Sequence, residues 1–433
     1  MEYNDSKICK LLDYVPNNWQ AEVRESTARF KVICAGRRSG KTLLVSRDPK
    51  IGIVKYLFQN DKNVWIVAPS YDLTERVWEE VVKICRRQLA PLIEKINSSR
   101  GMQRIVTKLG TVIEAKSADD PRSLVGKGLD CLICDESALI DSVAWNESLR
   151  PSLIDRKGEG IFIGTPKQKN WFYNLWLKGN DPTQLEYKSW RFSSFDNNYL
   201  DKAELDKIVS EMPEIEYQQE ILADFLEGFG QLFRKVRQNF RDTLKPPESG
   251  HRYVMGVDLG KVRDFTVFCV FDRETNDLVF FDRFKEIDWT LQKTRIEALA
   301  RRYNRALVVI DSTGVGDPVV EDLKKVGLPI QEVKITSVNK HDFIRKLMLF
   351  IEQQRIHYPD IPELTGELES FGAWDAIKGE TKYCAAPGNH DDCVISMGLA
   401  VWVLKEILPG RTYSALDLTD NSYETEWHTA YGE

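Results

Sequence analysis

The segment VICAGRRSGKTLLVS, residues 32–46, restricts the possible folds of this chain more than any other stretch. An apolar run leads into a loop that ends in Gly40, Lys41 and Thr42, and an apolar pattern of helical spacing follows. A strand, such a loop and a helix in this order hold phosphates, because loop N–H groups and the helix N-terminus point at them. The sequence therefore predicts a nucleotide site in which Lys41 reaches the β- and γ-phosphates and Thr42 ligates Mg²⁺.

Two arginines, Arg37 and Arg38, lie inside the predicted loop. The pattern G-x-x-x-x-G-K-[ST] is not fully met, because Ala35 stands where its first glycine belongs. We expect Arg37 to stabilise or sense the transferring phosphoryl group. The alternative is an ion pair between the arginine and a nearby acid. The residues expected around the nucleotide are Ala35, Gly36, Arg37, Arg38, Ser39, Gly40, Lys41 and Thr42.

A pair of acids supports the same site. The apolar run LICDES contains Asp135 and Glu136 at its polar end. At the carboxyl end of a buried strand an Asp can hold the Mg²⁺ shell, and the adjacent Glu can polarise an attacking water. This arrangement favours a hydrolase over a kinase. Two solvated acids at the end of a strand are the alternative.

Three further residues complete the expected site. Thr165 follows the run IFIG and is placed to sense the γ-phosphate, although the same residues also suit an ordinary turn. Upstream, Trp19 offers a stacking face, and Gln20 offers a donor and an acceptor to an adenine edge. We therefore expect ATP with Mg²⁺ as the cofactors of this part of the chain.

Short apolar runs alternate with helical patterns through the first half of the chain, which indicates an α/β fold with a parallel sheet. Because 433 residues exceed one ordinary core, we expect two domains. The first is a P-loop NTPase domain over residues 1–233, with a small lid subdomain at about 171–230. A charged linker is expected at 234–250. Strands are expected at 30–35, 63–69, 129–136 and 160–166.

The pattern restarts after the linker. Three apolar runs joined by short turns predict an antiparallel meander, and RALVVID predicts a further buried strand after a helix at 289–303. The run DDCVISMGLAVWVLKEIL predicts a closing apolar helix. This order fits a ribonuclease H-like fold over residues 251–408. Residues 409–433 are acidic and polar, and we expect them to form a flexible tail.

Carboxylates stand at the ends of elements in this second domain. Asp258 and Asp311 each end a predicted strand, and Asp391 and Asp392 begin the closing helix. Buried carboxylates are costly unless they pair or ligate. We expect them to hold two Mg²⁺ or Mn²⁺ ions about 4 Å apart and to cleave phosphodiesters. One of the adjacent pair is expected to cap the helix, so the choice of ligand between them stays open. His390 is either a partner of these acids or a surface residue.

Composition excludes other classes of protein. The formal charge of −6 argues against tight coating of nucleic acid; if the chain contacts DNA, we expect its grip to be weak and salt-sensitive. No apolar run approaches the roughly 20 residues that span a bilayer. Cys131 and Cys134 share C-x-x-C spacing, but we expect them on opposite faces of one strand, which disfavours zinc. The scattered cysteines indicate reduced thiols in a cytoplasmic setting.

The succession of motifs resembles the large terminase subunits of tailed bacteriophages. The resemblance covers most of the chain and rests on WQ, AGRRSGKT, VAPSYDLTERVW, GLDCLICDES, GTP, GVDLG, VVIDSTGVGD and HDD in this order. It implies a viral DNA-packaging motor that uses ATP to move double-stranded DNA into a procapsid. It also implies an endonuclease that cuts concatemeric DNA when packaging starts and ends.

The resemblance implies partners and a location as well. These are the portal protein of the procapsid, a small terminase subunit that recognises DNA, and a ring of five copies of the chain on the portal. The protein would act in the host cytoplasm, dock transiently at the portal vertex, and contact no membrane.

Residue roles follow from the same resemblance. In the nucleotide site, Lys41 and Thr42 bind phosphate and Mg²⁺, and Asp135 supports the metal. Glu136 is the catalytic base, and Arg37 occupies the arginine position of the phosphate loop.

The remaining roles concern coupling and DNA cleavage. Thr165 lies in the motif that couples hydrolysis to movement. Asp258, Asp311 and Asp391 match the nuclease triad.

One departure concerns an arginine that a neighbouring subunit would insert. Many members of the family carry it just before the strand of the acid pair, where this chain has Val125. Arg122, Lys127 and Arg150 are the candidates that the sequence offers in its place.

Two other functions compete with this interpretation. One is a helicase or repair-type ATPase whose ribonuclease H-like domain binds DNA without cleaving it. The other is a scaffold with degenerate motifs, against which the intact Lys41–Thr42 and Asp135–Glu136 pairs argue.

Overall fold

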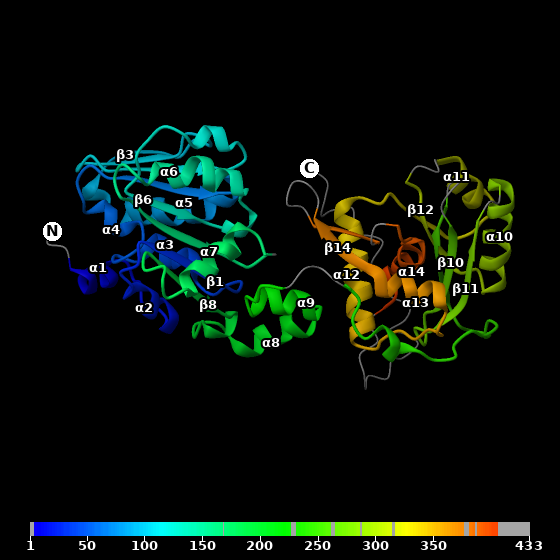
Figure 1. Ribbon diagram of the computed structural model, residues 1–433. Helices are drawn as coiled ribbons and strands as arrows, with labels where there is room; N and C mark the ends of the chain where they lie inside the picture. The colour runs from blue at the N-terminus through cyan, green and yellow to red at the C-terminus, as the bar shows by residue number, and fades with distance from the viewer. Residues whose placement is uncertain are drawn as a thin grey trace. The chain divides into compact units, whose positions relative to one another are not determined.

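The structure is a computed structural model that describes residues 4–167, 169–226, 231–260, 265–285, 288–313, 317–375, 381–385 and 388–405. The chain forms two compact units, each with its own central sheet (Figure 1). The first contains residues 1–232 and 372–384, and the second contains 233–371 and the described residues from 385 onward. The expected tail, 409–433, lies outside the described residues. Among the described helices, none has the length and apolar character that crossing a bilayer requires.

The first unit is built on an eight-stranded sheet in the order β3-β4-β5-β2-β6-β7-β1-β8. Neighbours from β5 to β8 run parallel, whereas β3 and β4 add an antiparallel edge. The four expected strands are present as β1, β2, β6 and β7, and the other four were not expected. The strands are β1 (Phe30–Ala35), β2 (Asn63–Ala68), β3 (Ile93–Asn97), β4 (Arg104–Thr107), β5 (Val112–Ser117), β6 (Cys131–Cys134), β7 (Glu159–Gly164) and β8 (Tyr187–Phe192).

Helices cover both faces of this sheet. The α-helices are α1 (Asp5–Leu11), α2 (Asn18–Arg24), α3 (Lys41–Arg47), α4 (Val54–Leu57), α5 (Tyr71–Arg87), α6 (Arg150–Ser152), α7 (Trp171–Asn180), α8 (Lys202–Ser210) and α9 (Glu214–Glu216). Single 3₁₀ turns are η1 (Ala90–Leu92), η2 (Pro121–Leu124), η3 (Ser137–Leu139) and η5 (Ser194–Asp196), and π turns are η4 (Ala144–Leu149) and η6 (Tyr217–Ile221). Within the range expected for a lid, α7 packs against β1 and β8, and β8 belongs to the sheet itself.

Alternation along the buried strands sends side chains into two separate cores. In β1, Ile33 packs in the core that α5 covers, whereas Val32 packs in the core that α7 covers. In β6, Cys131 and Cys134 fall into these two different cores, which confirms that they lie on opposite faces of the sheet.

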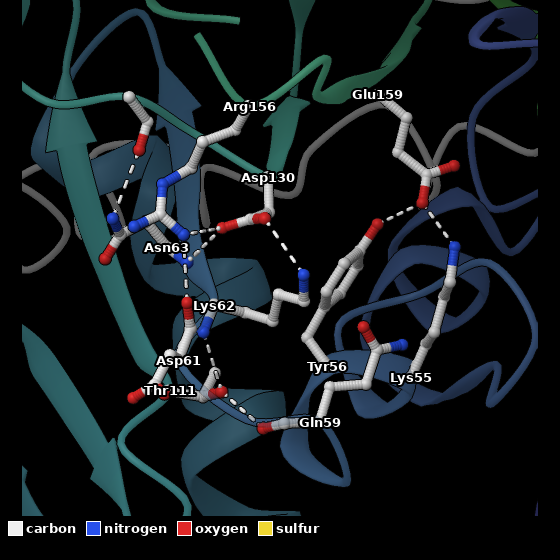
Figure 2. Close-up of polar contacts among 11 residues, drawn as sticks. Lys55, Tyr56, Gln59, Asp61, Lys62, Asn63, Thr111, Asp130, Arg156 and Glu159 are labelled. Carbon is white, nitrogen blue, oxygen red and sulfur yellow. Dashed lines mark hydrogen bonds and ion pairs between the residues drawn. The ribbon is translucent and has the colours of Figure 1, made fainter.

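A polar network secures the amino-terminal ends of the parallel strands (Figure 2). Asp130, just before β6, accepts from the backbone N–H of Asn63 at 2.9 Å, from Lys62 Nζ at 3.1 Å and from Arg156 Nη1 at 2.8 Å. Glu159, the first residue of β7, accepts from the Lys55 ammonium group and the Tyr56 hydroxyl group. These contacts tie the strands together at one edge, while the predicted nucleotide residues follow the strands at the opposite, carboxyl edge.

The second unit has a five-stranded sheet in the order β11-β10-β9-β12-β13. The expected meander is confirmed, because β10 pairs antiparallel with both β9 and β11, its neighbours along the chain. Strand β12 then pairs with β9 in parallel. The strands are β9 (Tyr253–Asp258), β10 (Thr266–Asp272), β11 (Leu278–Phe284), β12 (Leu307–Asp311) and β13 (Ile330–Val333). A separate two-stranded sheet, β14 (Phe371–Asp375) and β15 (Thr381–Ala385), falls almost entirely within the residues 372–384 that are grouped with the first unit. The helices are η7 (Val236–Asn239), α10 (Trp289–Arg302), α11 (Asp317–Lys325), α12 (Ser337–Glu352), α13 (Pro362–Ser370) and α14 (Asp392–Trp402).

The segment expected as a linker, 234–250, is grouped with the second unit and makes buried contacts within it. Asn239 is fully buried, and its side-chain amide donates to the Ile351 carbonyl at 3.0 Å. Thr243 donates to the Leu278 carbonyl at 2.6 Å. These hydrogen bonds fix part of the segment on the body of this unit.

Candidate functional sites

The predicted phosphate loop leaves the end of β1 and turns tightly beneath neighbouring segments. A Cβ at Gly36 would lie 2.4 Å from the Ile221 carbonyl oxygen and 2.5 Å from Ser194 Oγ, so the close approach requires glycine. The Gly36 N–H donates to the Phe192 carbonyl at 3.0 Å. Gly40 has a φ of +103°, a conformation that favours glycine and turns the chain into α3.

The start of α3 is available to an anion. Its N-cap, Gly40, provides no side-chain hydrogen bond to the first helical N–H groups. Lys41 is 9% exposed, and its Nζ donates to the carbonyls of Ala35 and Gly36 at 2.6 and 2.8 Å. Burial lowers the pKa of Lys41, and the charges of the neighbouring acids oppose that shift. An ammonium group therefore lies inside the loop, and the half-buried Thr42 follows it.

The acid pair follows β6 at the same edge of the sheet. Asp135 is 3% exposed, and burial followed by the charge of Glu136 raises its pKa to about 7. The side chain of Asp135 accepts from the Glu136 N–H at 2.9 Å. Glu136 has a φ of +47°, which is unusual for a residue with a Cβ and redirects the chain directly after the strand.

Arg76, on α5, was not predicted from the sequence. Its Nη1 lies 3.8 Å from Glu136 Oε1. The arginine belongs to the segment VAPSYDLTERVW, whose helical pattern was recognised without a role for this side chain. The contact places a cation next to the expected catalytic base.

Arg37 contacts an acid that is distant in the sequence. Its Nε donates to Glu220 Oε2 at 2.6 Å, and Lys167 pairs with the other oxygen of the same carboxylate. Burial alone would raise the pKa of Glu220, but the two cations lower it. Arg37 therefore adopts the ion pair that was the alternative to a catalytic position, although its side chain stays 68% exposed.

Arg38 and Ser39 shape the rest of the loop. Arg38 has a φ of +58°, and its carbonyl accepts from Asn197 Nδ2 at 2.8 Å. Ser39 is fully buried. Asn197, which lies in the range expected to form the lid, therefore holds this part of the loop.

Trp19 and Gln20 support the loop from α2. Trp19 Nε1 donates to the Ser39 carbonyl at 3.0 Å, and Gln20 Nε2 donates to the Gly40 carbonyl at 2.9 Å. The other end of the Gln20 amide accepts from the Asn17 N–H at 2.9 Å. Both side chains are 3% exposed. Their polar atoms are thus engaged with protein, in contrast to the adenine contact suggested by the sequence.

Thr165 lies directly after β7, the strand between β6 and β1. It is 4% exposed. The Cα of Gly164 is so close to the turn after Asp135 that an added Cβ would lie 3.1 Å from the Ser137 nitrogen. The carboxyl ends of β1, β6 and β7 therefore bring the loop, the acid pair and Thr165 to one edge of the sheet.

The candidates for an inserted arginine have different surroundings. Arg122 is 93% exposed and pairs with Asp120 at 3.3 Å. Lys127 lies 3.6 Å from Glu114, and the guanidinium of Arg150 lies over the Phe30 ring at 4.8 Å.

The second site is at the carboxyl end of β9 and β12. These strands pair in parallel, and Val257 is the partner of Ile310. Asp258 and Asp311 follow these two residues, so they stand side by side at the sheet edge. The side chain of Asp311 also accepts from the Thr313 N–H at 2.8 Å.

Helix α14 brings two further acids to this edge. The helix packs directly on β9, because a Cβ at Gly256 would lie 1.9 Å from the Ser396 carbonyl oxygen. Ser396 Oγ donates to the Gly256 carbonyl at 3.0 Å. Asp392 begins the helix one turn before Ser396, and Asp258 follows Gly256 by two residues along the strand. Close packing at Gly256 therefore determines where the acidic end of α14 lies.

The four carboxylates influence one another. Burial raises the pKa of Asp258 well above its usual value, and the charges of Asp392, Asp311 and Asp391 raise it further, in that order. Lys340, on α12, opposes the shift; its Nζ lies 3.1 Å from Asp391 Oδ2. A cation is thus already present beside this group of acids.

As expected for one of the adjacent acids, Asp391 occupies the N-cap position of α14, but its side chain makes no capping hydrogen bond. Instead Glu367, on α13, accepts from the Cys393 N–H at 2.7 Å. Asp392 Oδ2 is buried without a hydrogen-bond partner among the described residues, and His390 Nδ1 lies 3.5 Å from it. Burial, followed by the charge of Glu367, raises the pKa of Asp392 to about 6.

The donor set at this edge suits a hard divalent cation. Asp258, Asp311, Asp391 and Asp392 offer carboxylate oxygens, which Mg²⁺ and Mn²⁺ prefer. The unpartnered Asp392 oxygen and the mutual repulsion of the acids are the features that a bound cation would relieve. In the described part of the chain, no three His, Cys, Asp or Glu side chains are yet close enough together to hold a metal ion as they stand.

Comparisons with known proteins agree with this arrangement. A family model described as "Terminase large subunit, T4likevirus-type, N-terminal" matches residues 32–239, and one described as "Terminase RNaseH-like domain" matches residues 255–402. The large terminase subunit of Thermus virus P23-45 is 30% identical over 441 residues, covering 91% of this chain and 88% of that protein. The corresponding protein of Thermus phage G20c is 29% identical over the same length and coverage. A solved structure of the large terminase from a thermophilic bacteriophage matches 89% of this chain and 98% of its own length, with 16% identity and a TM-score of 0.57, so it shows the same fold.

Proposed function

Because this chain belongs to the family of large terminase subunits, we propose that it is the motor of viral DNA packaging and the nuclease that cuts the packaged DNA. In this proposal the first unit hydrolyses ATP to drive double-stranded DNA into the procapsid. The second unit cuts concatemeric DNA at the start and at the end of packaging. The observation that carries the proposal is the presence of two acid-containing sites, each at the carboxyl edge of a different sheet.

In the first unit, the uncapped start of α3 and the loop N–H groups bind the phosphates of ATP. Lys41 moves from the loop carbonyls to the β- and γ-phosphate oxygens. Thr42 and Asp135 would hold Mg²⁺, which neutralises charge on the transferring phosphoryl group when bound. Glu136 orients the attacking water and accepts its proton, which yields ADP and phosphate.

Two arginines are placed to act with these groups. Arg37 is held by Glu220 and lies in the loop, so release of this pair would direct the guanidinium to the phosphates. Arg76 lies beside Glu136 and adds a positive charge next to the proposed catalytic base. Thr165, after the strand between the loop and the acid pair, is placed to transmit the phosphate state to the rest of the unit.

In the second unit, Asp258, Asp311, Asp391 and Asp392 would hold two Mg²⁺ or Mn²⁺ ions. Such ions lower the pKa of a bound water and neutralise the leaving oxygen of a phosphodiester. Lys340 orients the Asp391 carboxylate and adds positive charge beside a DNA phosphate. His390 is next to Asp392 and is available to transfer a proton.

The proposal includes the assembly in which the motor works. Five copies would surround the DNA at the portal protein, a small terminase subunit would recognise the DNA, and the complex would form in the host cytoplasm. The net charge of −6 favours a grip on the DNA backbone that is readily released. A neighbouring copy would supply an arginine to the nucleotide site, with Arg122 as the most exposed of the three candidates.

Packaging is tested by mixing the purified chain with procapsids, the small subunit, DNA and ATP. We expect DNA to become resistant to an added nuclease only with hydrolysable ATP, and we expect the chain alone to cut closed circular plasmid in Mn²⁺. Unwinding of a forked duplex without cleavage would instead support the helicase-type function. Absence of ATP binding in a simple titration would contradict both the packaging motor and the helicase-type function, because each of them requires ATP.

A further inference from the structure

We infer that Glu367 is a positioning residue of the nuclease, which frees Asp391 for metal binding by taking over the capping of α14. This inference rests on the proposed function, because it concerns the acids expected to hold the metal ions. Its basis is the start of α14, where the N-cap Asp391 makes no capping hydrogen bond. A side chain from another helix accepts from an N–H group of the first turn instead.

A helix normally begins with a side chain that accepts from its first N–H groups, and Asp is among the most favoured residues for this role. Asp391 stands at this position of α14 but makes no such bond. Its carboxylate instead lies 3.1 Å from Lys340 Nζ, among the acids that raise the pKa of Asp258. If Asp391 capped its own helix, the same oxygens would be directed at backbone N–H groups and would be less available to a cation.

Glu367 satisfies the helix from outside. It lies on α13 and is 6% exposed. One of its oxygens accepts from the Cys393 N–H at 2.7 Å, directly after Asp392. A carboxylate at the start of a helix also interacts favourably with the helix dipole. The bond therefore fixes the turn that carries both expected ligands.

The second oxygen of Glu367 is occupied as well. It accepts from Arg283 Nη2 at 2.9 Å, and the Arg283 side chain is 15% exposed. The guanidinium lies 3.4 Å from the centre of the Phe265 ring, which contacts the His390 ring edge-on at 5.0 Å. Since both oxygens have protein partners, Glu367 acts through the helix rather than as a metal ligand. The Arg283–Phe265–His390 contacts also support the residue just before the acid pair.

Arg283 balances the charge of Glu367 in this buried position. Its guanidinium pairs with one Glu367 oxygen, while the other oxygen keeps the capping bond to the Cys393 N–H.

The test is Mn²⁺ binding to the full-length protein without nucleotide, measured by calorimetry and by the electron paramagnetic resonance of free Mn²⁺. We expect Glu367→Ala to lower the Mn²⁺ affinity about 10- to 100-fold, as is usual when the support of a metal ligand is lost. Glu367→Gln keeps an oxygen that can accept from the Cys393 N–H, so we expect it to retain more affinity than the alanine variant. The matched control is Glu363→Ala, which removes an exposed acid from the first turn of the same helix.

Plasmid cleavage provides the second readout. For Glu367→Ala, we expect the Mn²⁺ concentration for half-maximal cleavage to rise while the rate at saturating Mn²⁺ largely recovers. ATP hydrolysis should be unchanged. Equal Mn²⁺ affinity in wild type, Glu363→Ala and Glu367→Ala would overturn the inference, even if Glu367→Ala melted at a lower temperature. A wild-type protein that neither binds Mn²⁺ nor cleaves DNA would overturn the proposed nuclease itself, which is a distinguishable result.

Discussion

Asp258 and Asp311 stand at matching positions on two adjacent parallel strands, each one residue beyond the Val257–Ile310 pair. Two carboxylates in such positions repel each other unless a proton or a cation lies between them. The raised pKa of Asp258 reflects burial and the charges of its acidic neighbours. The site should therefore exchange protons for a divalent cation when the cation binds.

Replacing Asp258 by Asn should distinguish the two ways of relieving this repulsion, which are protonation of a carboxylate and binding of a cation. The folded state raises the pKa of Asp258, so its contribution to stability is present at low pH and is lost as pH rises through the folded pKa. In EDTA at pH 8, we expect Asp258→Asn to melt at a higher temperature than wild type. A gain of 1 kcal/mol corresponds to about 2–4 °C for a unit of this size.

Mn²⁺ should reverse that order. We expect Mn²⁺ to raise the melting temperature of wild type but to have little effect on Asp258→Asn, because the variant lacks one of the proposed ligands. Thermal denaturation with and without Mn²⁺ measures both effects. Equal stabilisation of the two proteins by Mn²⁺ would show that the cation binds elsewhere.

Gln20→Ala distinguishes support of the phosphate loop from recognition of adenine. The side chain donates to the Gly40 carbonyl and accepts from the Asn17 N–H. Loss of one such buried hydrogen bond costs about 1 kcal/mol, and leaving its partners unpaired costs more. If Gln20 holds the loop, we expect the KM values for ATP and GTP to rise by the same factor, about 5-fold or more. A rise for ATP alone would instead favour the adenine contact.

Gly36→Ala should destabilise the first unit at the phosphate loop. The added methyl group would meet the Ile221 carbonyl oxygen at 2.4 Å, and backbone atoms cannot move aside cheaply. Overpacking of this kind costs about 1–3 kcal/mol, so we expect a lower melting temperature and weaker ATP binding. Gly366→Ala is the matched control, because a Cβ added at this position of α13 would have no atom within 4 Å. That control should stabilise its helix by about 0.5–1 kcal/mol. Equal behaviour of the two variants would contradict the close approach at Gly36.

The raised pKa of Asp135 predicts that the stability of the nucleotide-free, metal-free protein depends on pH. Its folded pKa of about 7 lies above the usual 3.8, so the folded state binds a proton more tightly than the unfolded state. The corresponding stability is present below pH 4 and is lost as pH rises through about 7. Asn cannot ionise, so the stability advantage of Asp135→Asn over wild type should grow between pH 5 and pH 8. Its upper limit is about 4 kcal/mol.

Apparent melting temperatures in EDTA at both pH values measure this difference. Asp206→Asn, on an exposed position of α8, is the control. An advantage of Asp135→Asn that stays constant with pH would show that the carboxyl group does not titrate as the structure indicates.

The fully buried strands of the first sheet were the easiest elements to predict. All six residues of β1 are buried, and all except Lys31 are apolar, so the strand stands out as an apolar run. In β5 buried and partly exposed residues alternate, and β3 has no fully buried residue, so neither stood out as an apolar run. β8 carries Lys188 and Arg191 and lies in a stretch that reads as polar. Its membership in the sheet depends on pairing with β1, more than 150 positions away in the sequence.

The same distinction applies to the sites. Lys41, Asp135, Asp258 and Asp311 were identified because each stands where a strand or its following loop ends. Glu220 was not identified, since its role depends on contact with Arg37 across 183 positions. For such residues the neighbouring sequence carries no signal, because tertiary packing alone brings the partners together.

Glu367 is the clearest case of this limit. The Asp391–Asp392 pair at a predicted helix start suggested a local cap, which is the usual role of Asp there. The capping hydrogen bond comes instead from Glu367, which lies 26 positions before Cys393, the residue whose N–H it accepts, and Arg283 pairs with Glu367 from β11. Local sequence rules thus placed an acid at the N-cap position of α14 but did not show that the capping hydrogen bond comes from Glu367.

If one chain contains two separate phosphate chemistries, each can be lost without the other. The most direct test measures ATP hydrolysis and Mn²⁺-dependent plasmid cleavage side by side in Glu136→Gln and Asp311→Asn. We predict that Glu136→Gln loses hydrolysis and keeps cleavage without ATP, whereas Asp311→Asn keeps hydrolysis and loses cleavage. Loss of both activities in each variant, with both proteins folded, would contradict two separate chemistries.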